Sequence, residues 1–247
     1  MKLLPGIAIC LALAVAAYVF GHEIPIVGGP VFGIVLGMIV ATVRRPAPRL
    51  HPGIRFSSKF VLQASIVLFG ATFDLGQVIH TGLGSLPVML GTLVITLGAA
   101  YILGRMLGTA TVLRTLIGVG TAICGASAIA AVCGVLEADG PEIAYAISTI
   151  FLFNIVAVLI FPALGHLMGL SQSAFGLWAG TAINDTSSVV AAGFAYGHEA
   201  AAQAVVVKLT RTTLIVPIVL ALGIIRIARE RHSGSVDWAA DIPWFIV

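Results

Sequence analysis

Charge is what this 247-residue sequence has least of, because Asp, Glu, Lys and Arg together make up only 9% of it. An average soluble domain contains about 25% of these residues. Apolar residues account for 59% of the chain, and the mean hydropathy is +1.10. So few charges could not cover the surface of a water-soluble protein of 25.5 kDa. The composition therefore excludes a soluble domain and indicates a polytopic membrane protein.

Cysteine is scarce as well, and no metal-binding or nucleotide-binding pattern is present. Cys10, Cys124 and Cys133 lie in apolar runs without paired or ligand-like spacing, so we interpret them as small helix-packing residues. The six histidines lie at the ends of apolar runs, and neither a clustered ligand set nor a Ser-His-Asp constellation appears. We therefore expect no metal and no cofactor. The net charge of +3 comes from too few and too scattered cations to bind nucleic acid.

Long apolar runs define the expected architecture, because about 20 helical residues are needed to span a bilayer. The sequence contains eight such runs, which are Leu3–Phe20, Ile24–Val43, Lys59–Ile79, Leu83–Leu107, Leu116–Leu136, Glu142–Leu164, Ser173–Phe194 and Ala200–Ile225. We expect the first run to be retained as a helix rather than cleaved as a signal peptide. A ninth run, Ile242–Val247, stops with the chain. The prediction is an all-α membrane protein with about eight spans and discontinuous helices, forming one transmembrane domain over residues 1–247 that is truncated at its C-terminus.

The loop cations are segregated to one side if these eight spans alternate. That side carries Lys2, Arg44, Arg45, Arg49, Arg55, Lys59, Arg105, Arg114, Arg226, Arg229 and Arg231. The opposite loops carry no Lys or Arg, and their charged residues are Glu23, Glu137, Asp139, Glu142 and Glu199. Because cytoplasmic loops are enriched in Lys and Arg, the N-terminus is predicted to be cytoplasmic.

Two cations remain inside a span. Lys208 and Arg211 are three residues apart, so they share one helix face, at depths of roughly 12 and 16 Å. Each intramembrane cation costs about 2.5–3.5 kcal/mol and usually faces a cavity or a counter-ion. One interpretation is a structural ion pair with Asp185, which lies at a similar depth of roughly 18 Å. We favour an anion-binding site, because one acid cannot neutralise two bases.

A sequence motif is repeated after 60 positions, and its two copies differ in polarity. Gly120–Ala131 and Gly180–Ala191 both begin with the letters GTAI and both contain small hydroxyl residues. The second copy places five consecutive polar residues, Asn184–Ser188, inside an apolar run. We predict that both copies are interrupted helices that meet near the middle of the membrane, although close helix packing would also explain the first copy.

The direction of the two copies is a separate question. Alternating spans would orient them alike, whereas inverted-repeat transporters oppose their repeats. Either one copy is re-entrant, or the similarity reflects shared chemistry rather than symmetry. A glycine ridge at Gly29, Gly33 and Gly37 is predicted to serve helix packing. The weaker site candidates are Gln63, Asp74 and Asn154, which are residue types that often form hydrogen bonds between helices.

Several short segments spread along the chain form one combined pattern, namely Pro30–Met38, Leu68–Gly70, Cys124–Ala128, Asn184–Gly193 and Val207–Arg211 followed by Pro217. This combination resembles the YeiH-type sulfate exporter family over essentially the whole chain. The resemblance implies a bacterial inner-membrane protein related to the bile acid, arsenite and riboflavin transporters. It also implies discontinuous helices that cross and about ten spans. The eight spans expected in this chain are fewer than that number.

The residues and the resemblance together favour a secondary transporter of a small anion, such as sulfate or a related sulfur oxyanion or sulfonate, driven by an ion gradient. The residues expected to bind the substrate are Lys208, Arg211, Asn184, Asp185, Thr186, Ser187, Ser188, Thr121 and Ser127. Asp185 is also the expected carrier of a coupling proton or cation. The alternatives are an intramembrane enzyme that uses Asp185, or a channel or scaffold subunit. The expected partners are membrane lipid, the anion, and a second copy of the chain if the glycine ridges mediate a homo-oligomer.

Overall fold

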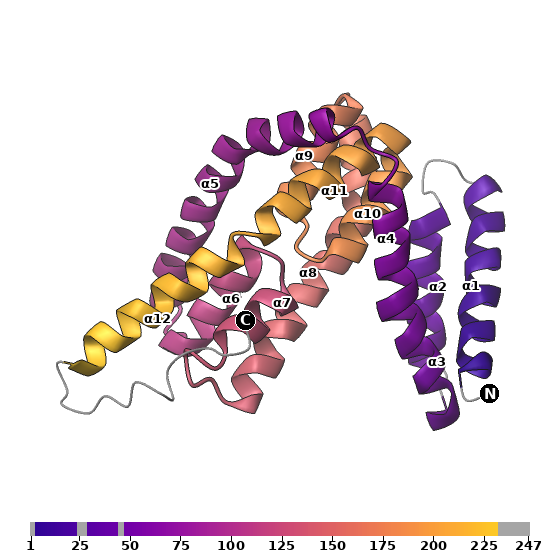
Figure 1. The fold of residues 1–247 in the computed structure, drawn as a ribbon. Coiled ribbons are helices and arrows are strands. Elements are labelled where there is room, and N and C mark those ends of the chain that lie inside the picture. The colour runs from indigo at the N-terminus through magenta and orange to yellow at the C-terminus, as the bar shows by residue number, and fades with distance from the viewer. Residues whose placement is uncertain (1–2, 24–28, 44–46, 232–247) are drawn as a thin grey trace.

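The structure, a computed structural model, describes residues 3–23, 29–43 and 47–231. The terminal run 242–247 and three of the loop cations (Lys2, Arg44 and Arg45) lie outside these residues. Every regular element in the described ranges is helical, as predicted (Figure 1). The elements are α1 (Leu4–Glu23), α2 (Gly29–Val43), η1 (Pro48–Leu50), α3 (His51–Phe56), η2 (Ser57–Val61), α4 (Leu62–Gly70), α5 (Leu75–Met106), α6 (Thr111–Ala122), α7 (Ala126–Val132), α8 (Gly140–Leu167), α9 (Gln172–Ala182), α10 (Thr186–Tyr196), α11 (His198–Thr212) and α12 (Ile215–Arg231).

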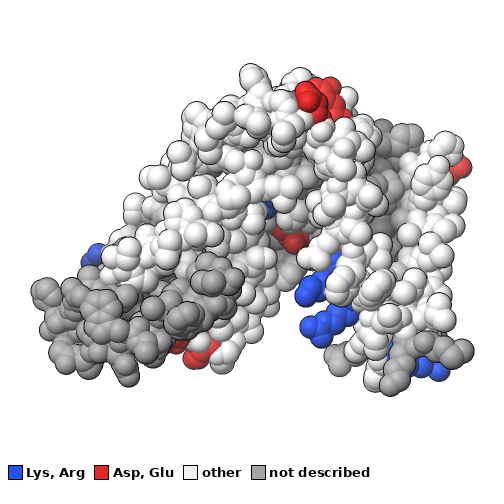
Figure 2. Space-filling view, in the orientation of Figure 1, with Lys and Arg blue, Asp and Glu red and all other residues white. Residues whose placement is uncertain are grey.

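Four helical stretches among the described residues are long and apolar enough to cross a membrane, and they are Leu4–Glu23, Val78–Met106, Gly140–Leu167 and His198–Ile224. The helices α2 and α6 are shorter but also apolar. The face of the molecule in Figure 2 is mostly uncharged; some of its acidic and basic side chains lie toward the ends of the helices, and others lie in a hollow in the middle. This distribution fits a protein whose middle is surrounded by hydrocarbon.

The helices α1, α2 and α3 form one packed group. The helices α1 and α2 contact each other where Gly29 and Gly33 face Ala17. The chain then runs as one nearly continuous helix through α3, a π-helical turn η2 and α4, and this helix ends at Gly70. The third predicted span, Lys59–Ile79, is therefore interrupted at residues 71–74, before α5 begins at Leu75. The start of α1 crosses α3 very closely, because a Cβ atom added to Gly6 would lie 2.3 Å from the carbonyl oxygen of Leu50. Only a glycine permits this approach.

The helices α6 and α7 form a hairpin that begins and ends at the same end of the molecule. The helix α6 stops at Ala122, and the chain reverses through a short turn in which Gly125 has a φ of 71°. The side chain of Ile129 on α7 then packs back onto Gly120 of α6. Residues from the start of α6 share one hydrophobic cluster with residues that follow α7 and with the first half of α8. The chain therefore returns to the end at which α6 began.

The helices α9 and α10 form a second hairpin, which enters from the opposite end. The ring of Phe175 near the start of α9 stacks on the ring of Tyr196 at the end of α10, with centroids 3.9 Å apart. The hydroxyl of Tyr196 also donates a hydrogen bond to the carbonyl of Leu170, just before α9. The amide oxygen of Gln172 accepts hydrogen bonds from the backbone N–H groups of Glu199 and Ala200, at 3.0 and 3.2 Å. Both arms of this hairpin therefore meet where α8 ends and α11 begins.

These hairpins correct the predicted topology at two places. The runs Leu116–Leu136 and Ser173–Phe194, predicted as the fifth and seventh spans, do not cross the molecule. The two copies of the repeated motif consequently lie at the tips of hairpins that enter from opposite ends. Both copies are re-entrant and inverted, which decides the alternative that the sequence left open. The prediction that both are interrupted helices is confirmed, since the breaks fall at residues 123–125 and 183–185.

A second correction concerns the acidic loop between α7 and α8. Eight alternating spans would place Glu137 and Asp139 opposite the loop cations. Because α6 and α7 form a hairpin, this loop instead lies at the end that carries Arg105 and Arg114. Figure 2 shows acidic side chains at the lower end of the molecule, where α8 begins in Figure 1. The loop between α8 and α9, which eight alternating spans would place on the side of the loop cations, lies instead at the end where α11 begins. The sides assigned to the other loops do not change, because the two re-entrant hairpins cancel in the count.

Candidate functional site

The tips of the two hairpins meet beside the middle of α8. Asn154 is the meeting point, because its Oδ1 atom accepts hydrogen bonds from the backbone N–H groups of Asn184 at 2.9 Å and of Asp185 at 3.4 Å. A Cβ atom added to Gly125, in the turn of the first hairpin, would lie 3.5 Å from the Cβ atom of Asn184. The two tips therefore touch each other as well as α8.

Lys208, on α11, joins both hairpin tips. Its ammonium group donates one hydrogen bond to the carbonyl of Ile123 at 2.8 Å and another to the carbonyl of Ile183 at 2.9 Å. These two carbonyls occupy corresponding positions in the two copies of the motif, 60 residues apart. The side chain of Lys208 has an exposed fraction of 0%.

Arg211, one turn further along α11, repeats this arrangement with its guanidinium group. Its Nε atom donates to the carbonyl of Ala122 at 2.7 Å, and its Nη2 atom donates to the carbonyl of Thr121 at 2.9 Å. Its Nη1 atom donates to the carbonyl of Thr181 in the second hairpin. Arg211 has an exposed fraction of 1%.

The accepting carbonyls explain why two cations are buried here. Thr121 and Ala122 end α6, and Thr181 lies in the last turn of α9, where the final carbonyls of a helix have no intrahelical donor. The partial negative charge of a helix C-terminus also attracts cations. Interrupting two helices therefore creates a cluster of unpaired carbonyls, and Lys208 and Arg211 satisfy this cluster from a single helix.

The ion pair with Asp185 that the sequence left open is absent from the described residues. The carboxylate of Asp185 instead caps the start of α10, where its Oδ2 atom accepts hydrogen bonds from the backbone N–H and the hydroxyl of Ser188 at 3.0 and 3.2 Å. The hydroxyl of Ser187 donates to the same oxygen atom. Lys208 and Arg211 thus have carbonyl partners but no carboxylate partner in the described part of the chain. The positive charge at the tips exceeds the negative charge.

Two buried amide atoms at the tips have no hydrogen-bond partner among the described residues: Nδ2 of Asn154 and Oδ1 of Asn184. The side chains are 3% and 5% exposed, respectively. The orientation of the Asn154 amide follows from its contacts, because its Oδ1 atom already accepts two backbone N–H groups. Nδ2 of Asn154 is therefore an N–H donor that is held at the tips and not used. A buried polar atom of this kind calls for a partner such as a water molecule or a ligand.

The other predicted site residues lie at different positions around the tips. Thr186, Ser187 and Ser188 form the first turn of α10 and are half-buried, while Thr121 supplies its backbone carbonyl to Arg211. Ser127 is exposed on the first turn of α7. Asn154 makes hydrogen bonds between segments, as its residue type suggests, but one amide in an apolar helix does not reveal that its partners are backbone groups 30 residues away.

The remaining weak candidates lie away from the tips. Asp74 caps α5 by accepting a hydrogen bond from the backbone N–H of Gly76 at 3.4 Å, and Gln63 is exposed on α4. No group of three or more His, Cys, Asp or Glu side chains in the described ranges is arranged to hold a metal ion.

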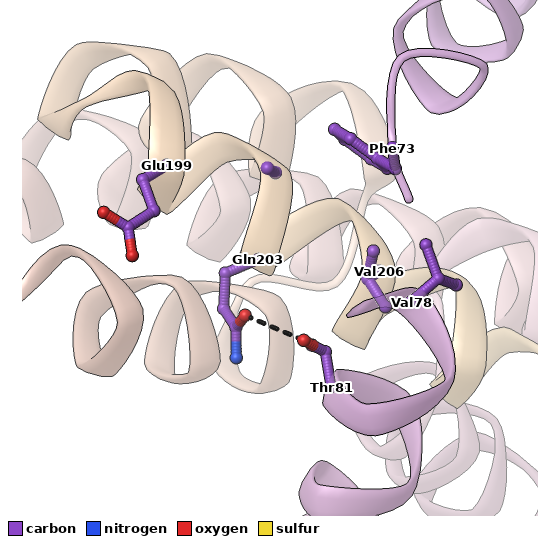
Figure 3. Close-up of a pocket in the computed structure, with 7 residues that line it drawn as sticks. Phe73, Val78, Thr81, Glu199, Gln203 and Val206 are labelled. Carbon is purple, nitrogen blue, oxygen red and sulfur yellow. Dashed lines mark hydrogen bonds between the residues drawn. The ribbon is translucent and has the colours of Figure 1, made fainter. Parts of the chain in front are cut away.

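A small pocket near the start of α5 and the start of α11 is separate from the tips (Figure 3). Its volume is about 40 Å³, which is enough for water. The hydroxyl of Thr81 on α5 donates a hydrogen bond to Oε1 of Gln203 on α11 at 3.3 Å across it. Figure 3 shows Glu199 on the same helix as Gln203. This contact ties α5 to the helix that carries both buried cations.

The fold and the tips define an all-helical, multi-pass membrane protein with two inverted re-entrant hairpins. The chain belongs to the family described as Conserved hypothetical protein 698, which it matches over residues 5–247. This match confirms the resemblance to the YeiH-type family.

The relatives are described as UPF0324 membrane proteins. One from Streptococcus agalactiae serotype V is 42% identical over 99% of this chain and 74% of its own length. Another from Fusobacterium nucleatum subsp. nucleatum is 43% identical over 98% of this chain and 72% of its own length. A third, from Streptococcus mutans serotype c, is 44% identical over 94% of this chain and 69% of its own length. No solved structure matches the chain significantly.

Proposed function

We propose that this protein is a secondary transporter of a small anion in the bacterial inner membrane, with its N-terminus in the cytoplasm. The observation that carries the proposal is the pair of buried cations, Lys208 and Arg211, that joins two inverted hairpin tips without a carboxylate partner in the described chain. Intramembrane cations with this surplus of positive charge favour an anion. Inverted repeats with interrupted helices that meet in mid-membrane are the usual architecture of a secondary transporter.

The anion binds at the tips through hydrogen-bond donors that the described residues do not use among themselves. An ammonium and a guanidinium have more N–H groups than Lys208 and Arg211 use on the described carbonyls. The unused Nδ2 donor of Asn154 adds a third group, in a fixed orientation. The hydroxyl groups of the first turn of α10 complete the set, and those of Ser187 and Ser188 turn from the Asp185 carboxylate to the anion when it binds. A planar guanidinium suits an oxyanion, because it can donate paired hydrogen bonds, and sulfate or a related sulfur oxyanion or sulfonate is therefore the substrate class.

Asp185 couples anion movement to an ion gradient. Ionised, the trio of Lys208, Arg211 and Asp185 carries one net positive charge, which a bound anion offsets. Protonation of Asp185 raises the positive charge and strengthens anion binding, which links a proton to the anion. Thr121 and Ser127 lie at the first tip and belong to the same site in this proposal.

Counterflow in proteoliposomes containing the complete protein tests the proposal. Vesicles loaded with unlabelled sulfate, sulfite, thiosulfate or an organic sulfonate should accumulate the labelled anion transiently and saturably. Absence of counterflow for every member of the panel would contradict a transporter of this class. Flux without saturation would indicate a channel, and chemical conversion of the anion would indicate an enzyme.

Matched variants test the binding residues. In folded, reconstituted protein, Lys208→Gln and Arg211→Gln should weaken anion affinity, while the exposed control Arg105→Gln should not. Asp185→Asn should keep uptake but lose its pH dependence. If both buried-cation variants bind the anion normally and only lose stability, the cations are structural and the anion site is wrong.

A further inference from the structure

An apolar groove lies among the first helices, far from the hairpin tips in the sequence. Its volume is about 570 Å³, which is in the range of about 300–1,000 Å³ that ligand pockets occupy. The groove is formed by α1, α2 and the segment that leads into α3. Its apolar walls include Ile9, Leu13, Val40, Ala41, Leu50 and Ile54.

The groove exists because of how glycines are distributed in the three walls. The closely crossing Gly6 and Gly53 hold the start of α1 against α3. Along α2, Gly29 and Gly33 contact α1, but a Cβ atom added to Gly37 would meet no atom within 4 Å. The packing role predicted for the glycine ridge therefore applies to its first two members only. Gly37 lines the groove instead, and its missing side chain leaves the space open.

Cations lie at one end of this groove. Arg49 lines the groove and is exposed. A neighbouring hollow of about 580 Å³ is lined by Arg55 and Lys59 together with the aromatic rings of Phe56 and Phe60. Figure 2 shows Lys and Arg side chains beside the helix that runs from α3 to α4, and a smaller group of them at the lower end of the molecule. An apolar groove between membrane helices thus ends in cations on the side predicted to be cytoplasmic.

We infer that the groove binds an anionic diacyl phospholipid, with one acyl chain along the apolar walls and the phosphate against Arg49. The charge favours an anionic lipid, because basic pockets between transmembrane helices on the cytoplasmic side bind anionic head groups. The apolar walls favour a lipid over a free anion, which would make no use of them. This site requires neither Lys208 nor Arg211, so it stands independently of the proposed transport function.

Native mass spectrometry of the complete, delipidated protein tests the inference. The protein is titrated with equal amounts of phosphatidylglycerol and phosphatidylethanolamine, and we expect preferential retention of phosphatidylglycerol. Arg49→Gln should reduce that retention about fivefold, since one cation near the head groups contributes about 1 kcal/mol. Gly37→Leu should fill the groove and reduce retention of the acyl chain. Glycerol phosphate, which has the head-group charge but no chain, should not compete.

Two controls separate the groove from general effects. Arg105→Gln removes an exposed cation from the same end of the molecule, and Gly98→Leu adds a side chain to α5 at a glycine that also meets no atom within 4 Å. Neither should alter lipid retention. Equal retention of the two lipids, or unchanged retention in both Arg49→Gln and Gly37→Leu, would overturn the inference. A groove covered by another protein segment would also overturn it, because then no lipid would be retained and Gly37→Leu would lower the melting temperature.

Discussion

Replacing Arg211 with methionine should measure how strongly the two hairpin tips depend on one guanidinium group. Methionine keeps a long apolar side chain but removes every N–H donor. Three carbonyls, those of Thr121, Ala122 and Thr181, would lose their partner in a buried place. Each buried carbonyl left unsatisfied costs about 1–3 kcal/mol, so the expected loss is about 3–9 kcal/mol. This is a large part of the 5–15 kcal/mol or so that stabilises a typical protein.

The assay is thermal unfolding of the purified protein in detergent. A loss of 1 kcal/mol lowers the melting temperature of a chain of this size by about 2–4 °C, so Arg211→Met should lower it by at least about 6 °C. Arg211→Lys should fall in between, because a compact ammonium does not reproduce the spread of Nε, Nη1 and Nη2 with which the planar guanidinium reaches three separate carbonyls. Arg105→Met, at an exposed position, should change stability by less than about 0.5 kcal/mol. If Arg211→Met melts together with the wild-type protein, the guanidinium does not hold the tips together.

Two further substitutions examine the same region. Asn154→Leu should lower the free energy of unfolding by about 2–6 kcal/mol, because two backbone N–H groups of the second tip lose their acceptor. Asn154→Asp should still fold, but added anion should raise its melting temperature less than that of the wild-type protein. Equal anion stabilisation of Asn154→Asp and wild type would remove Nδ2 from the site. Gly180→Ala would place a Cβ atom 2.7 Å from the carbonyl oxygen of Ala204. This substitution should lower the melting temperature, because it separates α9 from α11. The control Gly98→Ala should leave the melting temperature unchanged or raise it, because the added Cβ atom meets no other atom within 4 Å. A neutral Gly180→Ala would contradict this close packing.

Hydropathy predicted the membrane class and the long helices but not the hairpins. The run Leu116–Leu136 has the length and apolar character of a span, and a hairpin whose tip is buried in protein needs the same apolar surface as a crossing helix. The loop cations could not expose the error, because two hairpins in succession restore the alternation. Only the two loops beside α8 change sides. The first carries the acidic Glu137 and Asp139, neither carries Lys or Arg, and acidic residues contribute little to topology.

The buried cations could be found from the sequence, but their partners could not. The energetic cost of an intramembrane charge marks Lys208 and Arg211 without any structure. Among the side chains, the counter-ion that the sequence suggests is Asp185. The structure supplies backbone carbonyls instead, at Ile123 and Ile183 for Lys208. Carbonyls are freed only where helices are interrupted, and residue type does not record which carbonyls those are.

The account depends most on the two hairpins entering from opposite ends, and sided cysteine labelling tests this directly. In a background with Cys10, Cys124 and Cys133 replaced by alanine, single cysteines are introduced at Arg49, Asp139 and Glu199. A membrane-impermeant thiol reagent is then applied to intact cells and to inverted vesicles. The account expects Asp139→Cys to label from the same side as Arg49→Cys, and Glu199→Cys from the opposite side. Labelling of Asp139→Cys from the same side as Glu199→Cys would restore the eight-span topology and contradict the inverted hairpins.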